Sequence, residues 1–73
     1  MRTLEQVKEL AARRVKDHVA GNMPILQSQA FMRFAQGLRE SDFEEVVIDL
    51  LTQKVIARDM TQRGAFILRK YVG

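Results

Sequence analysis

Few side chains of this 73-residue sequence could carry out a chemical reaction. There is no cysteine and only one histidine, His18, so a thiolate nucleophile, an imidazole metal cluster and a Ser-His-acid set are all missing. A glycine-rich phosphate loop is missing as well. These residues predict a protein that is not an enzyme and that needs no cofactor. We interpret His18 as a structural or solvated residue.

One group of carboxylates lies close enough in the sequence to suggest a hard cation: Asp42, Glu44, Glu45 and Asp49. Cation-binding loops, however, need oxygens that converge from a curved backbone, whereas these four residues fall along one predicted helix. We therefore interpret them as a solvated acidic face that complements the helix dipole. No metal site is expected.

Positive and negative side chains are separated along the chain. Residues 1–39 carry a net charge of +4, residues 40–57 carry −4 and residues 58–73 carry +3, which leaves +3 overall. This separation indicates surfaces of opposite sign and partners selected by electrostatic complementarity. The predicted partner-binding residues are the cations of the C-terminal segment: Arg58, Arg63, Arg69 and Lys70.

Part of this basic segment resembles a helix-turn-helix, the motif that places a recognition helix in the major groove of DNA. In residues 53–67, Ala57 occupies the small position where the two helices pack, and Ile67 occupies a buried position of the recognition helix. The segment departs from the motif at Thr61, where glycine is usual, and at Gln62, where an apolar residue is usual. DNA binding through the basic C-terminal segment is therefore the alternative function.

The element expected to organise the fold is residues 41–60, the densest apolar stretch. Ser41 and Glu44 have the spacing of a reciprocal N-capping pair, and neither glycine nor proline interrupts the stretch. These features favour a central helix over a strand through residues 46–51. Its apolar side chains cover more than one face, so neighbouring elements must pack on two sides: Phe43, Val46, Val47, Ile48, Leu50, Leu51, Val55 and Ile56.

A helix is also predicted at the start of the chain. Thr3 and Gln6 form a second capping pair, and we expect this helix to begin at Leu4. Its buried stripe consists of Leu4, Val7, Leu10, Ala11, Val15 and Val19. Gly21 is expected to end the helix in a left-handed conformation.

The segment between these two helices predicts one more helix. Pro24 suits the first helical position, although Ser28 could instead cap a shorter helix that begins at Gln29. Gly37 is expected to close this helix in a left-handed conformation, with Leu38 packing back on the preceding turn.

The C-terminal segment has two interpretations. Residues 57–61 could extend the central helix or turn, and residues 65–72 could form a helix or a strand. Gly64 disfavours a helix by about 1 kcal/mol relative to alanine. Because no second strand is evident as a pairing partner, we favour a helix. The predicted fold class is all-α, a single helical domain over residues 1–73 built as a bundle of three or four helices.

Composition also predicts the compartment. Without cysteine there is no disulfide framework, and no apolar run resembles a signal peptide or reaches the length of a membrane span. We expect a cytoplasmic protein that does not engage a membrane.

The chain as a whole has the character of a small protein-binding regulator. Met23, Met32 and Met60 are each expected to fill gaps in the core, but methionine and arginine are also favoured at adaptable interfaces. In size and character the chain resembles the small transcription regulators that bacteriophages encode to bind host RNA polymerase, in particular those of Xanthomonas phages. The resemblance implies stoichiometric binding to a bacterial protein, with RNA polymerase as the candidate whose transcription is inhibited or modified, in the host cytoplasm.

Overall fold

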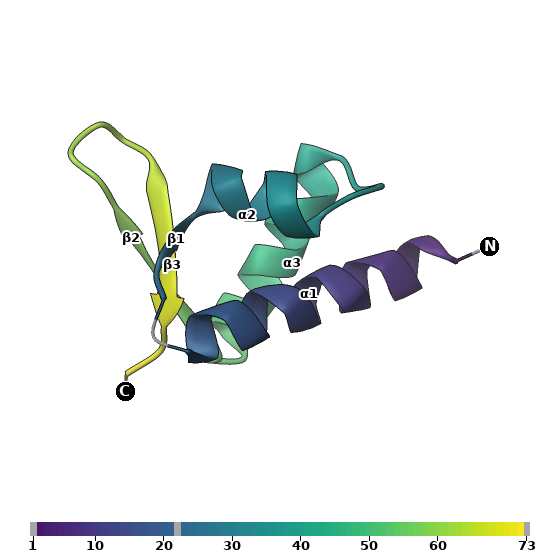
Figure 1. Cartoon of the computed structure of the whole chain (residues 1–73), viewed down its shortest axis with the longest axis horizontal. Coiled ribbons are helices and arrows are strands. Elements are labelled where there is room, and N and C mark those ends of the chain that lie inside the picture. Colours follow the sequence, from purple (N-terminus) through teal and green to yellow (C-terminus); the bar gives the residue numbers. More distant parts are fainter. Residues whose placement is uncertain (1, 22, 73) are drawn as a thin grey trace.

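The fold combines three helices with a three-stranded sheet, as Figure 1 shows for a computed structural model that describes residues 2–21 and 23–72. The elements follow the order α1 (Leu4–Ala20), β1 (Ile25–Leu26), α2 (Gln27–Phe34), α3 (Glu40–Thr52), β2 (Ile56–Met60) and β3 (Phe66–Lys70). The strands are antiparallel in the order β1-β3-β2. The prediction of an all-α helical bundle is therefore wrong, because the chain folds into mixed α and β structure.

Helix α1 begins where the sequence predicted. The Thr3 hydroxyl accepts a hydrogen bond from the Gln6 amide at 3.2 Å, and the Gln6 side chain accepts one from the Thr3 amide at 3.0 Å. The helix ends at Ala20, but Gly21 has a φ of −80°, so the expected left-handed closure is wrong. The buried stripe is shorter than predicted, because Leu4 is exposed at the open end of the helix.

The segment around Pro24 forms a strand before it forms a helix. Ile25 pairs with Leu68 and Leu26 pairs with Ile67, and α2 begins only at Gln27. The predicted helix start at Pro24 is therefore wrong, because pairing with β3 competes successfully with local helix propensity. Ser28 lies inside α2 and does not cap it.

The turn after α2 is closed by a glycine as predicted. Gly37 has a φ of +88°, a conformation that residues with a side chain rarely adopt. The following residue, Leu38, is buried, and its amide donates to the Ala35 carbonyl at 2.9 Å. This turn joins α2 directly to α3.

Helix α3 is the predicted central helix, but its limits differ. It starts at Glu40, where the Asp42 carboxylate accepts from the Arg39 amide at 3.4 Å, so the predicted Ser41–Glu44 cap is wrong. The helix ends at Thr52, because Lys54 adopts a left-handed φ of 60°.

Two hydrogen bonds close the last turn of α3. The Lys54 amide donates to the Leu51 carbonyl at 3.1 Å, and the Val55 amide donates to the Leu50 carbonyl at 3.0 Å. This pair of bonds is the Schellman motif, in which the left-handed position usually holds glycine. Because lysine rather than glycine holds that position, the end of the helix could not be recognised from the residue types.

The chain then forms a hairpin from strands β2 and β3. The Gly64 amide donates to the Thr61 carbonyl at 3.0 Å, the Thr61 amide donates to the Ala65 carbonyl at 2.7 Å, and Gly64 has a φ of +83°. A three-residue loop with glycine in the left-handed position is a favoured hairpin connection. The predictions of a helix over residues 65–72 and of a helix-turn-helix over residues 53–67 are therefore wrong.

The core lies where α1 and α3 pack on one face of the sheet, and among the described residues every buried side chain is apolar. Its largest fully buried side chains are Val15, Val19, Phe43, Val47, Ile56 and Leu68. Only the base of the hairpin, at Ile56 and Leu68, contributes to this core. Its tip extends past the core beside α2 (Figure 1).

The connectivity is that of a winged helix-turn-helix. Helices α2 and α3 are joined by a short turn, and the β2–β3 hairpin follows them as a wing paired with β1. The second helix of such a pair is the one that reads the major groove in DNA-binding helix-turn-helix proteins. In chain order, α3 is the second helix of the pair in this protein. Within the described residues, no helix is long and apolar enough to cross a membrane.

Candidate functional site

An open cleft of about 610 Å³ lies between α2, the start of α3 and the tip of the hairpin. Its apolar lining includes Phe31 and Met32 from α2, Phe43 from α3, and Phe66 from β3. The Phe31 and Phe43 rings are tilted against each other with their centroids 5.7 Å apart. The aromatic lining thus comes from three elements, which the fold brings together from distant parts of the sequence.

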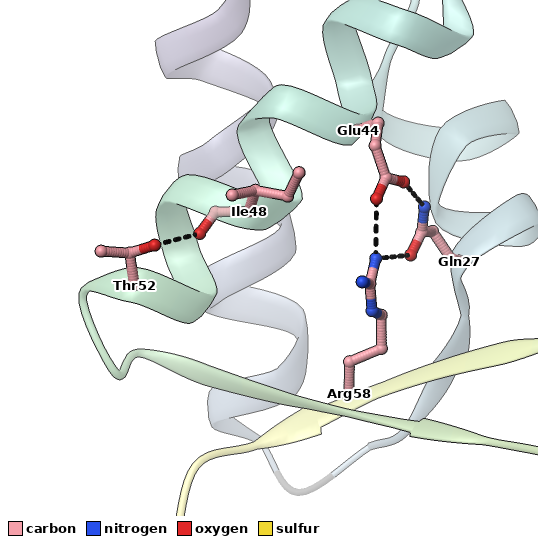
Figure 2. Close-up of polar contacts among 5 residues, drawn as sticks. All are labelled: Gln27, Glu44, Ile48, Thr52 and Arg58. Atoms are coloured by element: carbon pink, nitrogen blue, oxygen red, sulfur yellow. Dashed lines mark hydrogen bonds and ion pairs between the residues drawn. The ribbon is translucent and has the colours of Figure 1, made fainter.

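A polar network joins the three elements around the cleft (Figure 2). The Arg58 Nη1 on β2 donates to Glu44 Oε1 on α3 at 2.9 Å and to Gln27 Oε1 on α2 at 3.2 Å. Gln27 Nε2 in turn donates to Glu44 Oε2 at 2.5 Å. Each of the three side chains thus contacts the other two, which fixes the hairpin relative to both helices.

The same arginine also contacts an aromatic residue of the cleft. The Arg58 guanidinium carbon lies 4.1 Å from the centroid of the Phe66 ring, within the range of a favourable cation–π contact. Hydrogen bonds from Arg58 and Gln27 lower the pKa of Glu44 below its ordinary value, although partial burial of the carboxylate opposes this shift. Glu44 is therefore held in its ionised form.

The four predicted partner-binding cations lie on one hairpin but not on one surface. Arg58 points to the inner face and pairs with Glu44, whereas Arg69 lies on the outer face and pairs with Asp59. Arg63 is exposed in the loop at the hairpin tip, and Lys70 is exposed at the end of β3. The structure does not bring the four together, and their role in partner binding stays a prediction.

The exposed face of α3 is acidic. The helix contains five carboxylates and no lysine or arginine: Glu40, Asp42, Glu44, Glu45 and Asp49. Glu45 pairs with Lys8 of α1 at 2.7 Å, and this hydrogen bond raises the pKa of Lys8. Among the described residues no group of three or more potential ligands could hold a metal ion. The carboxylates give α3 a negative surface.

Several apolar side chains are exposed around this acidic helix. Ile48 is 47% exposed one turn after Glu44, and the Thr52 hydroxyl donates to the Ile48 carbonyl at 2.9 Å (Figure 2). Met32 is 75% exposed at the cleft, and Met23 and Met60 are also mostly exposed. The expectation that these methionines fill gaps in the core is therefore wrong.

Sequence reasoning missed the residues that shape the cleft. Phe66 was expected in a helix, but it lies on β3 and lines the cleft together with Phe31 of α2. Gln27 was given no role, although it bridges Glu44 and Arg58. One local signal was present, because Gly64 between two short apolar runs is typical of a hairpin turn. Nothing in the sequence pairs Arg58 with Glu44.

Comparison with known proteins gives no family for this chain. No protein-family model matches it, and neither a curated protein nor a solved structure is significantly similar to it.

Proposed function

We propose that this protein is a non-enzymatic regulator that acts by stoichiometric binding to a protein partner. The observation that carries the proposal is the charge of α3, the second helix of the helix-turn-helix pair, which has five carboxylates and no cation. A helix with this charge is repelled by the phosphates on both sides of a DNA groove. The same surface suits a protein partner that offers positive charge.

The apolar side chains beside α3 support the same proposal. Aromatic residues and methionine are enriched in the buried centre of protein interfaces. Here Phe31, Met32 and Phe66 line a single open cleft, and Ile48 is exposed on α3 nearby. Nucleic acid would gain little from such an apolar and acidic surface, because its binding depends on neutralised phosphates.

DNA binding through the basic C-terminal segment remains the alternative. Of its four cations, Arg58 and Arg69 are engaged by carboxylates of the chain itself. Arg63 and Lys70 are exposed, and no described carboxylate lies within ion-pair distance of either side chain. With two phosphate contacts, the logarithm of the DNA-binding constant would fall with the logarithm of the salt concentration with a slope of only about −2. This slope is much shallower than that of a specific DNA-binding protein.

The most concrete candidate partner is bacterial RNA polymerase. This candidate is supported by the resemblance of the chain, in size and character, to phage-encoded transcription regulators. A protein that binds host RNA polymerase would act in the host cytoplasm. Binding of this kind would inhibit or modify transcription without any chemistry on the part of the regulator.

The proposal is tested by offering the purified protein both kinds of partner. We expect it to co-elute with purified bacterial RNA polymerase at one-to-one stoichiometry and to change the yield of a transcription reaction in vitro. A labelled random-sequence duplex should bind weakly at physiological salt, in a fluorescence anisotropy titration, and without preference for sequence. Tight, sequence-dependent binding to a duplex would replace the proposal with the alternative.

A paired variant makes the DNA arm of this test sharper. Glu40→Gln with Asp49→Asn removes two exposed carboxylates of α3 for which no ion pair is present among the described residues. If α3 repels DNA, this variant should bind the duplex more tightly than the parent protein at low salt. The control is Glu5→Gln with Asp17→Asn on α1, which makes the same change of charge away from α3 and should have a smaller effect.

A further inference from the structure

The cleft between α2, α3 and the hairpin tip has the size and composition of a binding groove for a protein segment. Its volume of about 610 Å³ falls within the range of about 300–1,000 Å³ that is usual for ligand sites. Phe31, Phe43 and Phe66 form much of its wall, and Met32 stands 75% exposed at its edge. Phe43 is already buried, so an occupant would remove apolar area of Phe31, Phe66 and Met32 from water, which favours an occupant with apolar side chains.

The charge of the lining restricts the occupant further. Two carboxylates line the cleft, those of Glu40 and Glu44, and no described residue of the lining is a lysine or arginine. Arg58 compensates Glu44, so the exposed Glu40 is the carboxylate that stays available at the first turn of α3. An occupant with positive charge complements this site, although the chain as a whole carries a net charge of +3.

The walls of the cleft are fixed before anything binds. The contacts of Arg58 with Gln27 and Glu44 connect α2, α3 and the hairpin (Figure 2), and Arg58 also lies over the Phe66 ring. At the tip, the Thr61 hydroxyl accepts from the Ala65 amide at 3.0 Å and helps to hold the loop. A preformed groove loses less conformational entropy on binding than one that must be ordered.

We propose that this cleft binds a short basic amphipathic segment of the partner protein. The segment places an apolar side chain among Phe31, Met32 and Phe66 and presents a lysine or arginine to Glu40. A groove that takes an amphipathic helix or peptide by its apolar side chains is a common mode of peptide recognition. The inference rests on the proposed function, because it names the site and the partner chemistry of that binding activity.

The probe for the experiment is a library of random 12-residue peptides displayed on yeast and selected on the intact protein. Peptides that also bind the Ala65→Arg variant are then removed from the library. Ala65 is exposed in the cleft lining, and the substitution keeps both of its backbone hydrogen bonds. The added arginine places a positive charge at the cleft lining and repels a basic segment. We expect the surviving peptides to combine leucine or aromatic residues with lysine or arginine.

Matched variants then locate the bound peptide. Met32→Ala should weaken binding of a selected peptide by about tenfold, as expected for a central apolar contact, whereas Met23→Ala changes a similarly exposed methionine outside the lining and should change nothing. Glu40→Gln should weaken binding by about two- to fivefold, the range of an exposed ion pair. Glu5→Gln, in the first turn of α1, is its control and should leave the affinity unchanged.

Several results would overturn the assignment. Enrichment of acidic or neutral peptides, equal loss of affinity in Met32→Ala and Met23→Ala, or failure to enrich any peptide that distinguishes the parent from Ala65→Arg would each do so. Concentration-dependent dimerisation in sedimentation, abolished by Ala65→Arg, would assign the cleft to a second copy of the chain instead. If RNA polymerase is still captured by Ala65→Arg at full affinity, the proposed function holds while the assigned site is wrong.

Discussion

The two ends of the β2–β3 hairpin differ in what surrounds them. At the base, Ile56 and Leu68 are fully buried against the helices, whereas at the tip Phe66 and Ala65 line an open cleft. Arg58 is paired directly opposite Leu68 and bonds to both neighbouring helices. One hairpin thus holds the fold together at one end and lines an open cleft at the other.

The base of the hairpin should show the largest effect on stability. Leu68→Ala removes a side chain with no exposed area, and we expect the free energy of unfolding to fall by about 2–5 kcal/mol, which would unfold much of so small a protein. Val72→Ala, at a side chain that is 82% exposed just after β3, is the control and should change little. Urea titration followed by circular dichroism gives both values. Equal stability of the two variants would show that the base is not part of the core.

The polar network of the hairpin should show an intermediate effect. Arg58→Ala leaves Glu44 and Gln27 without their shared donor, so we expect a loss of about 2 kcal/mol from the free energy of unfolding. Arg69→Ala removes the exposed pair with Asp59 on the outer face and should cost much less. Urea titration gives the free energy of unfolding of both variants. If Arg69→Ala were the more damaging change, the inner network would not be what fixes the hairpin.

A pH titration isolates one member of that network. The pKa of Glu44 is lowered from 4.5 in the folded protein, so its contribution to stability is present above about pH 4.5 and is lost as the pH falls through the folded value. Glu44→Gln cannot titrate. The stability difference between the parent protein and Glu44→Gln, measured in urea at pH 7 and at successively lower pH, should therefore shrink. A difference that grew on acidification would contradict the ion pair.

How far the sequence predicts this fold depends on whether a signal is local. The Thr3 and Gln6 cap and the dense apolar run of α3 are local, and both helices form, although α3 ends at Thr52 rather than at residue 60. The pairing of β1 with β3 is not local, because β1 has only two residues and α2, α3 and β2 lie between the two strands. The main partner of β3 is the adjacent β2, but β2 has only five residues with two successive charges, which is too short a pattern to be recognised as a strand.

The candidate site was hidden for the same reason. Arg58 contacts residues that lie 14 and 31 positions earlier, and neither spacing corresponds to a turn of helix or a register of adjacent strands. The four C-terminal cations were recognised by charge, but charge could not show that two of them are engaged within the chain. Only the tertiary structure separates Arg63 and Lys70 from Arg58 and Arg69.

The junction between α3 and the hairpin should give the smallest effect, and one of opposite sign. Lys54 holds a left-handed position that favours glycine, so Lys54→Gly should raise the free energy of unfolding by about 0.5–1 kcal/mol. Gln53→Gly, one residue earlier at a helical φ of −76°, is the control and should destabilise instead. Thermal unfolding of the two variants checks the sign of each change. Destabilisation by Lys54→Gly would mean that the lysine side chain itself stabilises the helix end.

The most direct test of a protein-binding surface at α3 and the hairpin tip is to identify, by NMR, the backbone amides whose chemical shifts change on binding. The ¹⁵N-labelled protein is titrated in turn with a selected basic peptide and with a DNA duplex, and two-dimensional NMR spectra are recorded at physiological salt. The peptide should shift the amides of Phe31, Met32, Gly64 and Ala65, which line the cleft. The duplex should produce only weak shifts, confined to the neighbourhood of Arg63 and Lys70. Strong shifts along α3 on addition of DNA, with none at the cleft on addition of peptide, would contradict the account.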